Sequence, residues 1–118
     1  MPLNVFRAWR DRTPRRLVHI HRNDPAQLVV SLHGRINRQQ TDRIGYLLAG
    51  HAAGGPIEIH LDLGDVGLLA EPALLFVPLI NALAPGTSLT IHRAHPEHRR
   101  ALHRLGFDRI LTYNDTSV

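Results

Sequence analysis

Nine histidines could bind a metal ion in this sequence. The most closely spaced are His19, His21, His92, His95 and His98. Two such ligands on one strand face or one helical turn could chelate zinc, but a closed zinc site needs four ligands, and no acidic or histidine set converges on these. His19, His60 and His92 fall on the polar faces of expected strands, where we expect exposed histidines. The sequence therefore predicts no metal site.

Residues that could act as nucleophiles are few. Serine occurs only at positions 31, 88 and 117, never within Gly-x-Ser-x-Gly, and cysteine is absent. Neither a Gly-x-Gly-x-x-Gly nor a Walker A sequence is present to hold a phosphate. Asp62 and Asp65 flank the end of the clearest strand and could do acid/base chemistry, but acids at such junctions commonly cap turns. We predict a protein that is not an enzyme and needs no cofactor.

The charge of the chain is unevenly distributed. Its 118 residues, the size of one domain, carry a net charge of +4, and all 14 basic residues are arginines. Six of these lie within the first 22 residues, against one acid, Asp11. We expect an irregular basic tail over residues 1–14, able to attract phosphates or an acidic partner, before a domain over residues 15–118. No groove-reading motif accompanies the charge, so nucleic-acid binding is not expected.

The apolar pattern predicts an α/β fold. Residues 17–20 and 27–33 alternate around a turn signal at 23–25, which is typical of a β-hairpin. Asn37 is a suitable N-cap for a helix over residues 38–53. In the next strand Ile57, Ile59, Leu61 and Leu63 point one way, and residues 89–92 repeat the alternation. Such alternation in strands separated by helices indicates that helices cover one face of the sheet and that the other is wet.

The helix that begins near Pro72 is apolar almost all the way round and should end near residues 85–86. A helix of this kind is either fully buried or presents an apolar face to a partner. A last helix over residues 96–105 stops at Gly106, and residues 108–113 form a final short strand. The predicted order is ββαβαβαβ. No apolar run approaches the roughly 20 residues that span a bilayer, so we expect a cytoplasmic protein without membrane insertion.

Residues 57–75 carry the most information: Ile-Glu-Ile-His-Leu-Asp-Leu-Gly-Asp-Val-Gly-Leu-Leu-Ala-Glu-Pro-Ala-Leu-Leu. This stretch resembles the signature of STAS domains, the family of anti-sigma factor antagonists and of cytoplasmic modules on sulfate transporters. In that family a strand ending in Asp-Leu-Ser/Gly precedes an apolar loop, an Asp-Ser-Ser-Gly-Leu-Gly switch sequence and an apolar helix. Residues 32–37, Leu-His-Gly-Arg-Ile-Asn, look like the family's Leu-x-Gly-x-Leu-Asp, with Asn37 replacing the Asp. Residues 102–111 look like its closing Leu-x-x-x-Gly-Leu-x-x-x-Leu.

The resemblance covers residues 16–113 and implies a STAS-like sheet of about five strands with helices mainly on one face. The departures concern the switch. With Asp62 on the family's strand-end Asp, Ala70 falls on the switch Asp, Glu71 on the phosphorylatable Ser and Pro72 on the second Ser. In typical antagonists that Ser accepts a phosphate from the anti-sigma factor kinase, and the added charge of about −1.5 to −2 breaks the complex. Glu71 supplies a fixed charge instead, or merely caps the following helix near its dipole.

The resemblance therefore implies a bacterial, non-catalytic module that binds a protein partner and regulates transcription without phosphorylation at the usual position. The partner suggested by the family is an anti-sigma factor kinase, and a homodimer is the alternative. A different role, as a ligand-binding or transport-associated accessory subunit, also fits the family. The residues expected to contact the partner are Asn37, Asp62, Leu69, Ala70, Glu71, Pro72, Leu75 and Phe76.

Overall fold

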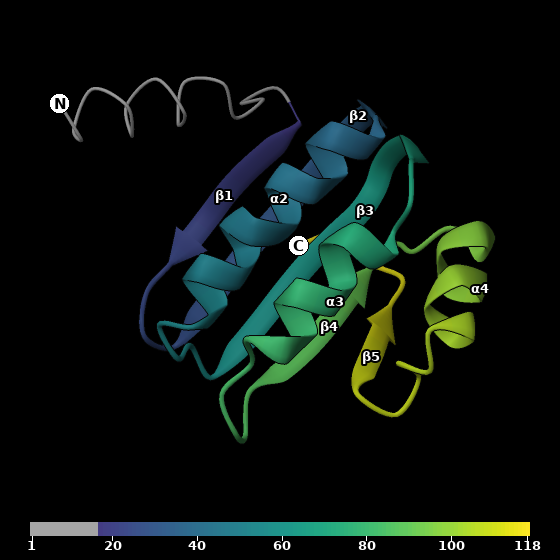
Figure 1. Ribbon diagram of the computed structural model, residues 1–118. Helices are drawn as coiled ribbons and strands as arrows, with labels where there is room; N and C mark the ends of the chain where they lie inside the picture. The colour runs from purple at the N-terminus through teal and green to yellow at the C-terminus, as the bar shows by residue number, and fades with distance from the viewer. Residues whose placement is uncertain (1–16) are drawn as a thin grey trace, which may run out of the picture.

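The computed structural model describes residues 17–118, so the basic tail expected over residues 1–14 lies outside the described residues. Five strands form one sheet in the order β1-β2-β3-β4-β5 (Figure 1). The strands are β1 (Val18–Asn23), β2 (Gln27–Ile36), β3 (Glu58–Leu69), β4 (Ser88–His92) and β5 (Leu111–Asn114). The helices are α2 (Arg38–Ala52), α3 (Ala73–Asn81) and α4 (Pro96–Arg104). This element order confirms the predicted α/β fold.

The sheet is mixed because its first pair is a hairpin and its other pairs are parallel. β1 runs antiparallel to β2, whereas β2–β3, β3–β4 and β4–β5 are parallel. The hairpin turn forms where Asp24 Oδ1 accepts hydrogen bonds from the N–H groups of Ala26 and Gln27, both at 2.8 Å. Parallel pairing brings the carboxyl ends of β2, β3 and β4 to one edge of the sheet. Loops at that edge are therefore neighbours in space.

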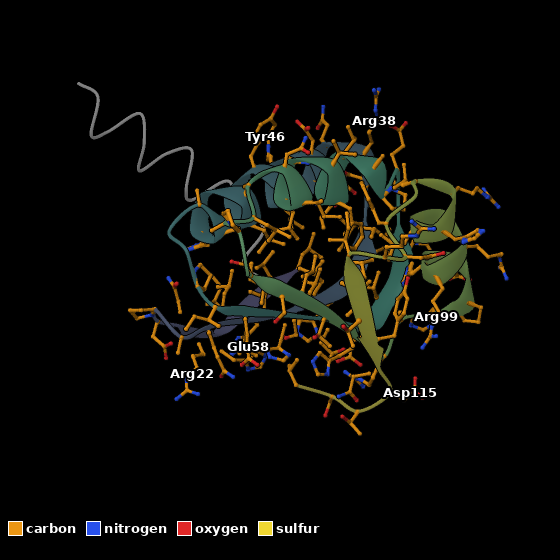
Figure 2. All side chains as sticks on the ribbon, turned by 90° about the horizontal axis from the view of Figure 1, so that it is seen from below. Arg22, Arg38, Tyr46, Glu58, Arg99 and Asp115 are labelled. Atoms are coloured by element: carbon orange, nitrogen blue, oxygen red, sulfur yellow. The ribbon has the colours of Figure 1, made fainter. Side chains whose placement is uncertain are left out.

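Helices α2 and α3 cover one face of the sheet, as Figure 2 shows, while α4 lies beside β4 and β5 (Figure 1). Between them lies the core, to which alternate residues of β2, β3 and β4 contribute most. The strand residues at its centre are Leu28, Val30, Leu32, Ile59, Leu61, Leu63, Leu89 and Ile91. The predicted one-sided arrangement of α2 and α3 is thus confirmed. No helix within residues 17–118 has both the length and the apolar character needed to cross a membrane.

Strand β3 differs from the sequence-based expectation at both ends. It continues to Leu69, six residues past the expected end at Leu63, because its pairing with β2 resumes after two irregularities and reaches Ile36 opposite Leu69. It begins at Glu58, and Ile57 is 64% exposed. The expectation that Ile57 points into the core was therefore wrong. The longer β3 carries the chain directly to the loop that precedes α3.

The ends of two further elements were also predicted wrongly. Helix α3 ends at Asn81 rather than near residues 85–86, because a tight i+3 hydrogen bond, from Leu83 N–H to the Ile80 carbonyl at 3.2 Å, closes it. Strand β5 begins at Leu111 rather than at residue 108, because Phe107 accepts hydrogen bonds that make residues 107–111 a turn. Neither change alters the order of elements.

Candidate protein-binding site

The loop between β3 and α3 contains Ala70, Glu71 and Pro72, the positions that the sequence resemblance aligns with the STAS switch sequence. The Ala70 N–H donates to the Ile36 carbonyl at 3.0 Å, so the loop is fixed to the end of β2. The Glu71 carbonyl then accepts from Leu74 N–H at 3.0 Å and starts α3. Glu71 itself has a φ of +47°, a left-handed conformation that an L-residue other than glycine adopts at a cost. The loop thus presents one exposed carboxylate in a strained backbone.

Helix α2 brings a cation to this carboxylate. Asn37 caps α2 through a capping box: its side chain accepts from Gln40 N–H at 2.9 Å, and the Gln40 side chain accepts from Asn37 N–H at 2.9 Å. Arg38, the next residue, places its Nε 3.3 Å from Glu71 Oε1. The two side chains are 71% and 55% exposed, so this ion pair is accessible to a partner.

The alternative role of Glu71 as a helix cap is contradicted. The N-cap of α3 is Pro72, and no side chain of the described residues 17–118 caps the helix by a hydrogen bond. The carboxylate of Glu71 meets Arg38 instead. The carboxylate is therefore exposed at the surface and does not accept hydrogen bonds from the first backbone N–H groups of α3.

A shallow groove runs from this ion pair along the line where α2 meets α3. It consists of two hollows of about 230 and 420 Å³, which share Asp42 and Leu74. Tyr46 and Val77, 62% and 39% exposed, line the larger hollow with Pro78. Figure 2 shows Arg38 and Tyr46 on the helix side of the molecule, pointing away from the sheet. We call the set Arg38, Asp42, Tyr46, Ala70, Glu71, Pro72, Leu74 and Val77 the Glu71 surface.

Several expected contact residues do not reach this surface. Leu75 and Phe76 are 0% exposed and pack in the core, and Leu69 is buried with them. Leu75 and Phe76 were predicted to touch a partner because α3 is apolar all round, and Leu69 because it begins the loop before α3. For direct contact, these predictions were wrong. The exposed apolar residue of α3 is Val77, and Leu74 is partly exposed; the hydrophobic pattern could not distinguish them from their buried neighbours.

Asp62 was also predicted wrongly as a contact residue, since it is 1% exposed and faces the helix-free side of the sheet. It accepts hydrogen bonds from Gly64 N–H at 2.7 Å, from Arg93 Nε at 3.1 Å and from Val118 N–H at 3.2 Å. Burial alone would raise the pKa of Asp62, but these donors outweigh burial and hold the pKa below its ordinary value. The residue ties β3 to the segment after β5.

The helix-free face is less wet than expected. His92, predicted to be exposed, is 6% exposed, because residues 115–118 cross this face. His92 Nδ1 donates to the Thr116 carbonyl at 2.8 Å, and its Nε2 lies 2.9 Å from His60 Nδ1. Since a carbonyl can only accept, Nε2 of a neutral His92 ring accepts from His60. Within residues 17–118, no group of three histidine or acidic side chains is arranged to hold a metal ion.

The same face holds a serine, histidine and aspartate in series, which the sequence did not suggest. Ser31 Oγ is 2.9 Å from His33 Nε2, and His33 Nδ1 is 3.4 Å from Asp65 Oδ2. This order matches a catalytic triad, but Ser31 is 4% exposed and its hydroxyl also contacts His21 at 2.8 Å. Ser31 is paired in the sheet on both sides, so its strand offers no free N–H group to stabilise an oxyanion. The series serves to bind β1, β2 and β3 together.

No protein-family model and no curated protein sequence matches the chain. Solved structures do match its fold. SpoIIAA, an anti-sigma factor antagonist in its unphosphorylated form, superposes with a TM-score of 0.66 at 12% identity, covering 85% of this chain and 89% of SpoIIAA. The phosphorylated form of the Bacillus cell fate determinant SpoIIAA gives 0.64 at 11% identity, with 83% and 91% covered.

An anti-sigma factor antagonist from Mycobacterium paratuberculosis gives a TM-score of 0.67 at 21% identity, covering 84% of this chain and 85% of that one. These neighbours match more than four fifths of the chain. The resemblance predicted from the sequence motifs is therefore confirmed at the level of the fold: this chain has the fold of the anti-sigma factor antagonists, the STAS fold.

Proposed function

We propose that this chain is a cytoplasmic, non-catalytic STAS-type module that binds a protein partner through the Glu71 surface and acts as an anti-sigma factor antagonist-like regulator of transcription. The observation that carries the proposal is the exposed Glu71–Arg38 pair, which lies where the family resemblance puts a phosphorylatable serine. The fold of the neighbours and the groove beside this pair support a binding role.

Regulation at this surface differs from that of a phosphorylated serine. A phosphate adds a charge of about −1.5 to −2 and can be removed, whereas a carboxylate carries −1 permanently. Arg38 offsets part of that charge, because its guanidinium lies 3.3 Å from the carboxylate. The surface is thus held in one state of charge, and the partner binds without a phosphorylation cycle at this position.

The partner we propose, an anti-sigma factor kinase, would contact both parts of the Glu71 surface. The half-exposed apolar side chains of the groove supply apolar surface that the partner would bury. Each large side chain buried on association contributes about 1.5 to 3 kcal/mol to binding. Asp42 and Glu71 add acceptors for an arginine or a backbone N–H group of the partner. Because the Arg38–Glu71 pair is exposed, its own contribution to folding is small, about 0 to 1 kcal/mol. Changes here should affect binding more than folding.

The test is a calorimetric titration of a candidate anti-sigma factor kinase with wild type, Glu71→Ser and Glu71→Gln. Both variants should bind about tenfold or more weakly, since a hydrogen bond to a charged group contributes about 1.5 to 3 kcal/mol. Glu97→Gln, which removes an exposed carboxylate from α4, is the matched control and should bind like wild type. Thermal unfolding of each variant separates lost affinity from lost structure.

Tighter binding of Glu71→Ser would overturn the proposal, because the carboxylate would then act as a permanent phosphate that holds the protein in the released state. A pull-down from the native cytoplasm identifies the partner independently. Recovery of a transporter ATPase would favour the transport-associated role instead. A concentration-dependent dimer that Tyr46→Asp abolishes would assign the surface to a second copy of this chain.

A further inference from the structure

A second site lies away from the Glu71 surface, in a cleft of about 570 Å³ between α4 and β5. The lining side chains are Arg99, Arg100, His103, Arg104, Asp108 and Tyr113. Clefts of this size are typical of small-molecule sites. Figure 2 labels Arg99 and, beyond β5, Asp115, on this side of the molecule.

The arginines that line the cleft carry more positive charge than the nearby carboxylates neutralise. Arg100 and Arg104 are exposed, one turn apart on α4, and neither has a hydrogen bond or ion pair within residues 17–118. Arg99 has one carboxylate partner, Asp115, at 3.2 Å, but Asp115 is 93% exposed and such pairs are weak. The carboxylate of Asp108 is already hydrogen-bonded to His103. Three guanidinium groups therefore face the cleft with little compensation.

A purely structural role explains only part of this cluster. Basic residues in the last turn of a helix interact favourably with its dipole, which accounts for His103 and Arg104. Arg100, four residues before Arg104, gains less from the dipole, and like charges at this spacing repel each other. The fold therefore does not require both arginines.

The floor of the cleft holds a polar group without a partner among residues 17–118. The hydroxyl of Tyr113 is buried and makes no hydrogen bond to this part of the chain. The Arg99 guanidinium carbon lies 4.3 Å from the centre of the Tyr113 ring and covers it. Arg99 is 44% exposed and weakly paired. A shift of its side chain would let a bound oxygen reach the hydroxyl. An anion would thus satisfy both the arginines and the tyrosine.

We propose that this cleft binds a phosphate group, either free or at the end of a larger molecule. Arginine donates paired hydrogen bonds that match the oxygens of a phosphate, and Arg100 and Arg104 are free to do so together. Tyr113 donates a further hydrogen bond from the floor. The site is independent of the Glu71 surface, because the two share no residue.

The experiment is a calorimetric titration of the full chain with inorganic phosphate, pyrophosphate and phenyl phosphate at low salt. Saturable binding is expected, and Arg100→Gln and Arg104→Gln should each weaken it about tenfold, as for loss of one charge-assisted hydrogen bond. Tyr113→Phe should also weaken it. Tighter binding of phenyl phosphate assigns the site to a phosphate monoester, and tighter binding of phosphate or pyrophosphate assigns it to the free anion.

Arg109→Gln is the matched control, because Arg109 is exposed and near α4 but does not line the cleft. It makes the same change in charge and should leave affinity unchanged. Equal weakening by Arg109→Gln would overturn the proposal, since binding would then reflect net charge alone. Binding that does not saturate would overturn it as well. The arginine variants change exposed side chains, so thermal unfolding should show that they remain folded.

Discussion

Helices α2 and α3 approach each other so closely at Gly45 that a single methyl group would push them apart. A Cβ atom built at Gly45 would lie 2.3 Å from the Leu74 carbonyl oxygen and 2.9 Å from the Leu75 Cα atom. Both are backbone atoms, so no side chain can rotate away to make room. At Gly50, five residues later in the same helix, a Cβ atom would meet nothing among residues 17–118 within 4 Å. The two glycines therefore make a matched pair.

The expected effects on stability have opposite signs. Replacing a helical glycine by alanine contributes about 0.5 to 1 kcal/mol of helix propensity, which Gly50→Ala should show as a gain in the free energy of unfolding. Gly45→Ala has the same gain but adds overpacking, which costs about 1 to 3 kcal/mol and more when backbone must shift. We expect Gly45→Ala to be about 1 to 2 kcal/mol less stable than wild type.

Urea unfolding followed by far-ultraviolet circular dichroism measures both variants, with the m-value as a check that the unfolded state is unchanged. Because the separation of α2 from α3 shapes the groove, Gly45→Ala should also weaken partner binding, and Gly50→Ala should not. An increase in stability for Gly45→Ala equal to that of Gly50→Ala would refute the packing argument. The groove would then tolerate a wider separation than the structure implies.

Three further outcomes are expected. Burial and nearby His95, against a smaller opposite effect of Glu97, hold the pKa of His98 below its ordinary value. Stability is therefore full above about pH 6.5 and falls as the pH drops below it, and urea midpoints should show a slope that His98→Leu flattens. Asp62→Asn should lower the free energy of unfolding by about 1.5 to 3 kcal/mol in the same assay, since it loses hydrogen bonds to a buried charge, whereas exposed Asp115→Asn should change it by less than about 0.5. Elemental analysis of untagged protein should find zinc, nickel and copper well below one equivalent. A full equivalent of any of them would contradict the prediction that the histidines form no metal site.

The order of elements followed from local patterns alone. Alternation in β3 and β4 indicated a sheet with one apolar face. Asn37 marked the start of α2 and Gly106 the end of α4, because a cap depends only on residues within one turn. The motifs and their spacing then suggested the STAS fold, which the solved neighbours confirmed. These features are encoded in residues close together in the chain.

The two proposed binding surfaces depended on contacts between distant residues. The sequence resemblance predicted Glu71 at the switch position, but only the packing of α2 beside the β3–α3 loop brought Arg38 to it. Helix α3 shows the limit most clearly: because nearly all its residues are apolar, its sequence does not specify which side faces the sheet, and Leu75 was assigned to the surface although it is fully buried. Likewise, the cleft beside α4 exists only because β5 places Tyr113 under Arg99. Strand register and helix packing decide such pairs, and they are set by the shape of the whole core rather than by spacing along the chain.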